Sequence, residues 1–381
     1  MPQPVLYLAV TSHGFGHAVR ASSIAAKIKQ LCPDILLILV TTAPRWLLDS
    51  YIREDFIHRI RAFDVGVIQS DSLTMDKTAT LEKMQQIRAE QRSIIASEVN
   101  FLRTNRVGLM LADIPPLAAP IAKAAGIPCW MVGNFGWDFI YRDWGRDATG
   151  HTRGRGDLAP QPLNFRVFTE LADWIGECYG QCDLTFRLPM HEPMAAFNNI
   201  TDVGLTGGTP YYSETQLQKE FNLKVPREKT ILLSFGGLGL QKIPYHNLQR
   251  FSDWQFITFD RLAPDLPNLL KMNGDTYRPV DFMPICGRII SKPGYSTFAE
   301  AICLGVPIVS LTREGFAESP LLMEGIQHYA RHQIVTPEEF FDGEWEFLDR
   351  EPNPPRLVTT LATDGSETIA RAVINYFQNL V

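Results

Sequence analysis

The stretch IISKPGYSTFAEAICLGVPIVSL, residues 289–311, has the pattern of a strand, a turn, a helix and a second strand. The first apolar run ends at Lys292, and Pro293 and Gly294 mark the turn. Small and apolar residues then follow at helical spacing as far as Gly305, where VPIVSL begins the next strand. Continuous apolar strands on either side of a helix predict a parallel sheet that is covered on both faces.

The polar residues of this segment have two interpretations each. Ser296 or Thr297 is expected to cap the helix, with Glu300 in its first turn, and such a capping box contributes ~1 kcal/mol. A carboxylate at the depth of Glu300 can also accept both hydroxyl groups of a ribose. Lys292 can neutralise phosphate or simply be exposed to solvent. The segment alone leaves these alternatives open.

Two further strands run into glycine-rich turns. VLYLAV precedes TSHGFGHAVR, residues 11–20, and TILLSF leads into SFGGLGL, residues 234–240. Glycines let a backbone approach a ligand closely, and a helix that follows offers free N–H groups and the positive end of its dipole. The first turn departs from GxGxxG, which argues against a dinucleotide. Either turn alone could be only a tight turn, but their equivalent places favour a ligand with phosphate or sugar oxygens.

The strand and helix patterns fall into two series, which indicates two domains. One alternation begins at residue 5 and a second near residue 229, with an irregular stretch between them that holds a helix near 166–180. A chain of 381 residues is also long for a single core. We expect an N-terminal domain at 1–200, a C-terminal domain at 201–362, and a last helix at 363–381 for which packing on the N-terminal domain is one option.

Composition limits the class of protein. With 45% hydrophobic and 20% charged residues, the chain resembles ordinary soluble globular proteins. A net charge of −6 gives no overall attraction to nucleic acid, so no such partner is expected, whereas peripheral contact with a membrane stays open. No apolar run is long enough to span a membrane, and the six cysteines complete no zinc site. We expect a cytoplasmic protein with free thiols and no metal.

Several polar side chains near strand ends are candidates for acid–base work or sugar binding. His17 follows Gly16 at the first turn of a helix and can accept a proton near neutral pH. His13 and His17 have the spacing of metal ligands, but no third ligand accompanies them. Asp138 lies among aromatic residues in GNFGWDFIY, which suits a sugar ring but equally a core cluster with a capping aspartate. Asp113 in ADIPP is a second carboxylate at a strand end, and the same two interpretations apply to it.

SKPGYSTFAEAICLGVPIV resembles the nucleotide-sugar signature of GT-B glycosyltransferases. The sequence is similar to glycosyltransferase family 28 and, more closely, to the N-terminal glycosyltransferase-like region of L-arabinokinases. That similarity continues through SHGFGHAVR, ADIPPLAAPIAKAAGIP, GNFGWDFIY, RLPMHEPM, SFGG and FAESPLLMEGI, and covers most of residues 5–328. The kinase half of arabinokinases has no counterpart in this sequence, so the resemblance does not imply sugar-kinase activity.

The resemblance implies a GT-B fold, in which two Rossmann-like α/β/α domains face each other across a cleft. The N-terminal domain would hold the acceptor and the C-terminal domain a nucleotide sugar, with a UDP-sugar as the expected donor and no cofactor. Gly14, Gly16 and His17 match the N-terminal turn of the family on the acceptor side, and we add Asp113 as an acceptor-side candidate. The implied donor-side residues are Gly236, Gly237, Gly294, Ser296, Thr297 and Glu300, together with Arg313, Glu318 and Ser319 in REGFAESP, and we add Lys292 as a candidate for phosphate. Family 28 has a glutamine pair in that loop, which is absent here, so the donor sugar stays open.

These observations predict a metal-independent glycosyltransferase with an unidentified acceptor. The glycine turns, a helix dipole and Lys292 or Arg313 would stabilise the departing nucleoside diphosphate. His17 or Asp138 would deprotonate the acceptor hydroxyl. Inversion at the sugar is what family 28 implies. Two alternatives stay open: a nucleotide-sugar 2-epimerase of the same fold, and a nucleotide-sugar-binding protein without catalysis.

Overall fold

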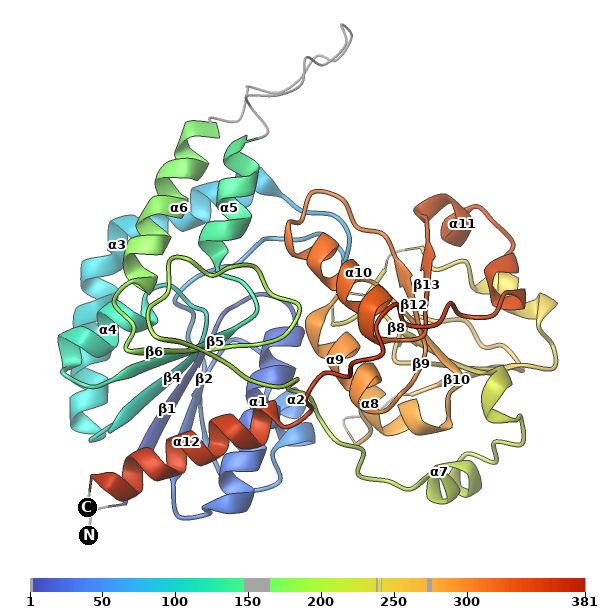
Figure 1. The fold of residues 1–381 in the computed structure, drawn as a ribbon, viewed down its shortest axis with the longest axis horizontal. Helices are drawn as coiled ribbons and strands as arrows, with labels where there is room; N and C mark the ends of the chain where they lie inside the picture. Colours follow the sequence, from blue (N-terminus) through green and yellow to red (C-terminus); the bar gives the residue numbers. More distant parts are fainter. Residues whose placement is uncertain (1–2, 147–164, 238, 241, 273–275, 381) are drawn as a thin grey trace, which may run out of the picture.

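The computed structural model describes residues 3–146, 165–237, 239–240, 242–272 and 276–380. It consists of two lobes that lie side by side, each built on one sheet with helices packed on it (Figure 1). Every named strand pairs with its neighbours in parallel, as the continuous apolar runs predict. The α/β class is confirmed. Part of the irregular stretch noted in the sequence, residues 147–164, lies outside the described residues.

The N-terminal lobe holds a seven-stranded sheet in the order β3-β2-β1-β4-β5-β6-β7. Its strands are β1 Val5–Val10, β2 Leu36–Val40, β3 Ile57–Arg59, β4 Leu109–Asp113, β5 Cys129–Gly133, β6 Leu184–Arg187 and β7 Ile200–Asp202. Its helices are α1 Gly16–Leu31, α2 Arg45–Tyr51, α3 Lys77–Thr104, α4 Ala118–Ala125, α5 Trp137–Arg146 and α6 Phe165–Tyr179. Every residue of β1 and β4 is buried, because helices cover both faces of the sheet at its centre.

The C-terminal lobe repeats this arrangement in a six-stranded sheet of order β10-β9-β8-β11-β12-β13. Its strands are β8 Thr230–Ser234, β9 Gln255–Thr258, β10 Leu269–Lys271, β11 Arg288–Ser291, β12 Ile308–Leu311 and β13 His332–Val335. The helices that follow the first lobe are α7 Glu214–Glu220, α8 Pro279–Phe282, α9 Tyr295–Cys303, α10 Glu318–Tyr329 and α11 Pro337–Phe341. The unit predicted from residues 289–311 is therefore β11, α9 and β12.

Helix α9 does not have the predicted cap. It begins at Tyr295 with Gly294 as the N-cap residue, and no side chain caps it. Ser296 lies inside the first turn, where its hydroxyl donates to the carbonyl of Gly16 at 2.7 Å, and Glu300 lies one turn further along. The expectation of a Ser296 or Thr297 cap with Glu300 as its box partner was wrong. These side chains are thus available to face a ligand or the other lobe.

The chain returns to the N-terminal lobe at its end. Helix α12, Gly365–Asn379, packs against α1 across the base of that lobe (Figure 1). A β-carbon on Gly108 would come within 2.9 Å of Phe377 Cε1, and the Tyr376 hydroxyl donates to the carbonyl of Gly108 at 3.1 Å. The last segment therefore spans from one lobe to the other and restrains their separation.

Two loops exchange apolar side chains between the lobes. Phe316, in the loop after β12, is buried in the core of the N-terminal lobe beside Phe135. Leu73, in the loop before α3, packs on the core of the C-terminal lobe. The neighbouring Ser72 hydroxyl donates to the carbonyl of Phe235 at 2.6 Å. The two lobes are thus in close contact beside the turns that follow their central strands.

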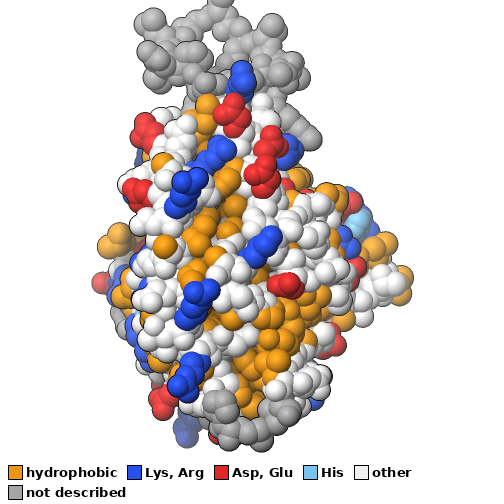
Figure 2. Space-filling view, turned by 90° about the vertical axis from the view of Figure 1, so that its left-hand side faces the viewer, with side chains coloured by type: hydrophobic (Ala, Val, Ile, Leu, Met, Phe, Trp, Pro, Cys, Tyr) orange, Lys and Arg blue, Asp and Glu red, His pale blue; other side chains and the backbone are white. Residues whose placement is uncertain are grey.

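The outer face of the N-terminal lobe carries basic and acidic side chains interspersed with apolar ones (Figure 2). This mixture fits the modest net charge of −6, which gives no strong field of one sign. No helix among the described residues combines the length and apolarity that a membrane span requires.

Candidate functional site

The two sheets have the same strand order at their centres, and this places the candidate site. In each sheet the order reverses between two neighbouring strands, β1 and β4 in the first and β8 and β11 in the second. Ligands of open parallel sheets bind beyond the carboxyl ends of strands at such reversal points. The predicted turns follow β1, β8 and β11, and Asp113 is the last residue of β4. In register, Val10 lies opposite Asp113 and Ser234 lies opposite Ser291. The sequence candidates therefore gather where both lobes can hold a ligand.

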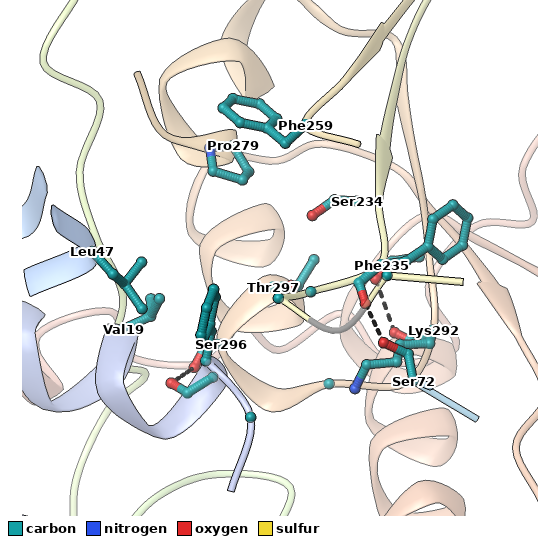
Figure 3. A pocket seen from close by; sticks show the side chains of 18 of the residues that line it. Val19, Leu47, Ser72, Ser234, Phe235, Phe259, Pro279, Lys292, Ser296 and Thr297 are labelled. Atoms are coloured by element: carbon teal, nitrogen blue, oxygen red, sulfur yellow. Dashed lines mark hydrogen bonds between the residues drawn. The ribbon is translucent and has the colours of Figure 1, made fainter. Parts of the chain in front are cut away.

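A cavity of 520 Å³ lies between the lobes at this place, within the usual range for a small-molecule site. Figure 3 shows Ser296 and Thr297 at the start of α9, with Val19 and Leu47 of the N-terminal lobe across from them. The predicted residues that line the cavity are Gly14, Gly16, His17, Gly236, Gly237, Lys292, Gly294, Ser296, Thr297, Glu300, Arg313 and Glu318. Asp113, Asp138 and Ser319 are not among its lining residues.

The two glycine turns touch each other. A β-carbon on Gly237 would lie 2.1 Å from Cδ2 of Phe15, so the phenyl ring rests directly on the second turn. Gly236 has a φ of 76° and Gly14 one of 56°, in the left-handed region that glycine adopts without strain. The backbone conformation therefore requires glycine at positions 14 and 236, and the close approach of the Phe15 ring requires it at position 237.

His17 and Asp113 form a hydrogen-bonded pair at the edge of the cavity. His17 Nδ1 lies 2.8 Å from Asp113 Oδ1, and Arg20 binds the same carboxylate through Nε at 2.7 Å and Nη2 at 2.5 Å. Burial raises the pKa of Asp113, but Arg20 and then His17 outweigh it and hold that pKa below its ordinary value. The carboxylate therefore stays ionised behind the imidazole.

A chain of hydrogen bonds connects this pair to the other lobe. Arg20 Nη1 donates to Asn134 Oδ1 at 2.9 Å, and Asn134 Nδ2 donates to Glu318 Oε1 at 2.8 Å. Asn134 follows β5, whereas Glu318 begins α10. Glu318 lines the cavity from the C-terminal lobe. Arg20 and Asn134 thus connect the Asp113 carboxylate to a residue of the other lobe.

Glu300 is buried on the opposite side of the cavity. Its Oε1 accepts hydrogen bonds from the N–H of Gly208 at 3.0 Å and the hydroxyl of Tyr51 at 3.3 Å. Burial raises its pKa to about 7, although the Gly208 N–H, Arg278 and the Tyr51 hydroxyl oppose this shift. The environment places the carboxyl near the midpoint of its ionisation at neutral pH.

Two cationic side chains, Lys292 and Arg313, also line the cavity. Burial lowers the pKa of Lys292 to about 8, and the charge of Arg313 lowers it further, whereas Glu318 opposes the shift. Burial likewise lowers the pKa of Arg313 to about 10. Such shifts indicate cations whose charge is poorly compensated by the protein itself. The arrangement suits an anionic ligand.

Asp138 is buried and does not line the cavity. Burial, followed by the charge of Glu192, raises its pKa to about 7, and its Oδ1 has no hydrogen-bond partner among the described residues. Ser319 is also buried with an unpartnered hydroxyl. The structure thus brings His17 and Asp113 together and leaves Asp138 separate from them.

Sequence reasoning missed three residues of the site: Arg20, Asn134 and Tyr51. Arg20 could have been found, because it stands three residues after His17 and so shares its helix face. Asn134 follows β5, which is the neighbour of β4 in the sheet. Tyr51 reaches Glu300 only through the contact between the lobes, for which the sequence holds no local signal.

The chain is similar in sequence to one curated protein, the L-arabinokinase of Arabidopsis thaliana. The two are 29% identical over 350 residues, which cover 90% of this chain but 31% of the arabinokinase. This chain therefore spans about a third of the length of that relative. No protein-family model matches the sequence.

Solved glycosyltransferases share the fold at low sequence identity. Phytolacca americana UGT2, complexed with UDP-2-fluoroglucose and pterostilbene, is 16% identical with a TM-score of 0.56, over 98% of this chain and 89% of that one. The calicheamicin glycosyltransferase CalG4 is 16% identical with a TM-score of 0.59, over 98% and 95% of the two chains. Os79 from O. sativa, in complex with UDP, is 17% identical with a TM-score of 0.59, over 91% and 90%. The two sheets and these matches together show that the chain has the GT-B fold of glycosyltransferases.

Proposed function

We propose that the protein is a glycosyltransferase that moves a sugar from a UDP-sugar to an acceptor hydroxyl, without a metal ion and with inversion at the sugar. The observation that carries the proposal is His17, which is hydrogen-bonded to Asp113 and lines the same cavity as the start of α9. The imidazole of His17 can remove a proton, and the N–H groups at the start of α9 can bind phosphate. The solved relatives support the donor class, because one of them holds UDP-2-fluoroglucose and another UDP.

The donor would lie on the C-terminal lobe. Glu300 offers a buried carboxylate to the ribose hydroxyls, as the sequence resemblance implies. The N–H groups at the start of α9, which no side chain caps, and the ammonium group of Lys292 would hold the diphosphate. The same groups would stabilise the charge that develops on the departing diphosphate.

His17 would act as the general base. Its Nδ1 carries the hydrogen of the 2.8 Å contact with Asp113 Oδ1, because the pKa of Asp113 is lowered and an ionised carboxylate can only accept. The lone pair then lies on Nε2, the nitrogen not bound to Asp113. Deprotonation of an acceptor hydroxyl at that nitrogen and attack on the anomeric carbon from the side opposite the diphosphate would invert the sugar.

The experiment is an assay for sugar release and transfer with UDP-sugars, alone and with candidate hydroxyl acceptors. We expect the wild type to release UDP and the His17→Ala variant to bind donor but release at least about 10²-fold less. A matched control is His328→Ala, because His328 does not line the cavity. A wild type that binds UDP-sugars and neither transfers nor hydrolyses them would favour the non-catalytic alternative. Conversion of the donor to its 2-epimer would favour the epimerase.

A further inference from the structure

Arg313 is a buried cation with two guanidinium nitrogens that lack a hydrogen-bond partner among the described residues. It follows β12, is 8% exposed, and the two nitrogens are its buried Nε and Nη2. The carboxylates that face it are engaged elsewhere. Glu318 Oε1 accepts from Asn134, and Asp71 Oδ1 accepts from the N–H groups of Leu73 and Thr74. A guanidinium group in this situation carries a desolvation cost that an anionic ligand would offset.

The two cations of the cavity have different immediate neighbours. Lys292 belongs to the glycine turns, because its Cε lies 3.6 Å from a β-carbon built on Gly236 and its Nζ lies 3.8 Å from one built on Gly294. The guanidinium of Arg313 lies 4.2 Å from the ring centre of Phe316, and that ring stacks on His13 at 5.9 Å. Lys292 therefore lies beside Gly236 and Gly294, whereas Arg313 lies against the ring that stacks on His13.

The sugar of the donor must lie between these two places. Its anomeric carbon is bonded to the diphosphate at one end and must meet the hydroxyl that His17 deprotonates at the other. The centre of the His13 ring lies 5.9 Å from that of His17, so the stack of Arg313, Phe316 and His13 flanks the same region. Arg313 is thus placed to meet a substituent of the sugar ring, with Lys292 left for the diphosphate.

We propose that Arg313 binds a carboxylate on the transferred sugar, so that the donor is a UDP-uronic acid. This inference rests on the proposed function and adds the substrate class to it. A guanidinium group pairs with a carboxylate through two parallel hydrogen bonds, which a neutral hydroxymethyl group cannot reproduce. A neutral hexose would leave the buried cation unpaired, and that difference is the source of selectivity.

The test is the binding of donors in the absence of any acceptor, by calorimetry. Five probes are compared: UDP, UDP-glucose, UDP-galactose, UDP-glucuronate and UDP-galacturonate. We expect the wild type to bind one uronate at least about 10-fold more tightly than the hexose of matching configuration, as a charge-assisted pair would give. The Arg313→Gln variant should lose this preference and keep its affinity for UDP within about 3-fold. Lys292→Gln is the matched variant and should lower the affinity for all five probes to a similar extent.

Each other outcome is informative. Loss of UDP affinity in Arg313→Gln equal to the loss of uronate affinity would make Arg313 a diphosphate residue and overturn the inference. Equal affinity of the wild type for uronates and hexoses would also overturn it and would assign the anion to the acceptor. Failure of the wild type to bind any of the probes would instead contradict the proposed function. Folding is monitored by melting temperature, which we expect to hold or rise in Arg313→Gln because an unpaired buried charge is removed.

Discussion

The phenyl ring of Phe15 rests on the α-carbon of Gly237, so that the glycine turns of the two lobes are in direct contact. A β-carbon at Gly237 would meet Phe15 Cγ at 2.4 Å as well as Cδ2 at 2.1 Å. Contacts at the base of the ring cannot be relieved by a small rotation of its tip. The hydroxyl of Ser296 reaches the carbonyl of Gly16 beside this contact. The separation of the lobes at the cavity is therefore set at these turns.

We expect Gly237→Ala to push the lobes apart and weaken donor binding by about 1–3 kcal/mol, the usual cost of overpacking a close contact. Donor affinity and turnover should fall together, because the methyl group displaces the first turn as well as the second. Removal of the obstacle in Phe15→Ala/Gly237→Ala should restore most of the loss. The measurement is donor affinity for the two single variants and the double variant.

Gly176→Ala is the control for this cycle. A β-carbon at Gly176 would meet Ala196 Cβ at 3.6 Å, an ordinary contact, and no cavity residue is involved. Equal effects of Gly237→Ala in the presence and absence of Phe15 would show that the two turns are not coupled.

His17→Ala should cut turnover by roughly 10²–10⁴-fold, the usual contribution of a general base. Donor affinity should change little, because the donor lies on the other lobe. A structural role for His17 predicts a different result, in which melting temperature, donor affinity and turnover all decline together. His17→Gln keeps a polar side chain of similar size in the turn and separates lost basicity from lost packing. Normal turnover in both variants would exclude His17 as the base.

The fold was predictable because it depends on local pattern. Apolar runs such as 5–10 and 230–235 could only be buried strands, and the glycine turns after them indicated where a ligand approaches. The pairing of His17 with Asp113 was not predictable, since 96 residues separate them and only the order of β1 and β4 brings them together. Both residues were singled out, but for separate roles.

At the start of α9, the local sequence predicted a cap that the structure does not have. Ser296 is a good capping residue by type, yet Gly294 takes the cap position because the turn after Pro293 begins the helix earlier. The serine hydroxyl then pairs with the backbone of the other lobe. Contacts between lobes compete with local capping, and a single sequence holds no signal for which of them prevails.

Donor affinity should depend on pH through Glu300. Its pKa is raised to about 7 by burial, so the carboxylate becomes more populated as pH rises from 6 to 8. If the ionised form accepts the ribose hydroxyls, the wild type should gain up to about 10-fold in affinity relative to Glu300→Gln over this range. Lys292 loses charge over the same range in both proteins, so the difference between them isolates Glu300. The measurement uses UDP-glucose, because a diphosphate esterified at both ends does not titrate there. Parallel pH profiles would leave Glu300 with only its contacts to Tyr51 and Gly208.

Transfer should survive removal of divalent metal ions. Lys292 and the uncapped start of α9 supply positive charge at the place proposed for the diphosphate. Among the described residues, no three His, Cys, Asp or Glu side chains gather as metal ligands would. We expect turnover in excess EDTA within about 2-fold of the untreated value. Activity that disappears with EDTA and returns with Mg²⁺ or Mn²⁺ would contradict this expectation.

Asp138→Asn should distinguish the second candidate base from a structural residue. Because Asp138 does not line the cavity, turnover should stay within about 3-fold of the wild type, whereas a catalytic base would give a loss of about 10²-fold or more. The substitution should instead change the free energy of unfolding. Burial raises the pKa of this carboxyl from 3.8 to about 7, so the folded state retains a proton that the unfolded state has released. The stability that this group contributes is therefore present below pH 4 and lost as pH rises towards 7.

Asparagine is neutral at every pH and avoids this loss. The free energy of unfolding of the variant should therefore rise relative to the wild type by about 3 kcal/mol between pH 5 and pH 8, as the linkage of the shifted pKa requires. Urea denaturation of both proteins at pH 5, 6.5 and 8 measures the difference. A pH-independent difference would mean that the Asp138 carboxyl is not held neutral by its surroundings. A large fall in turnover with unchanged stability would instead return Asp138 to the chemistry, reached from the cavity by a change in the aromatic cluster around Trp137.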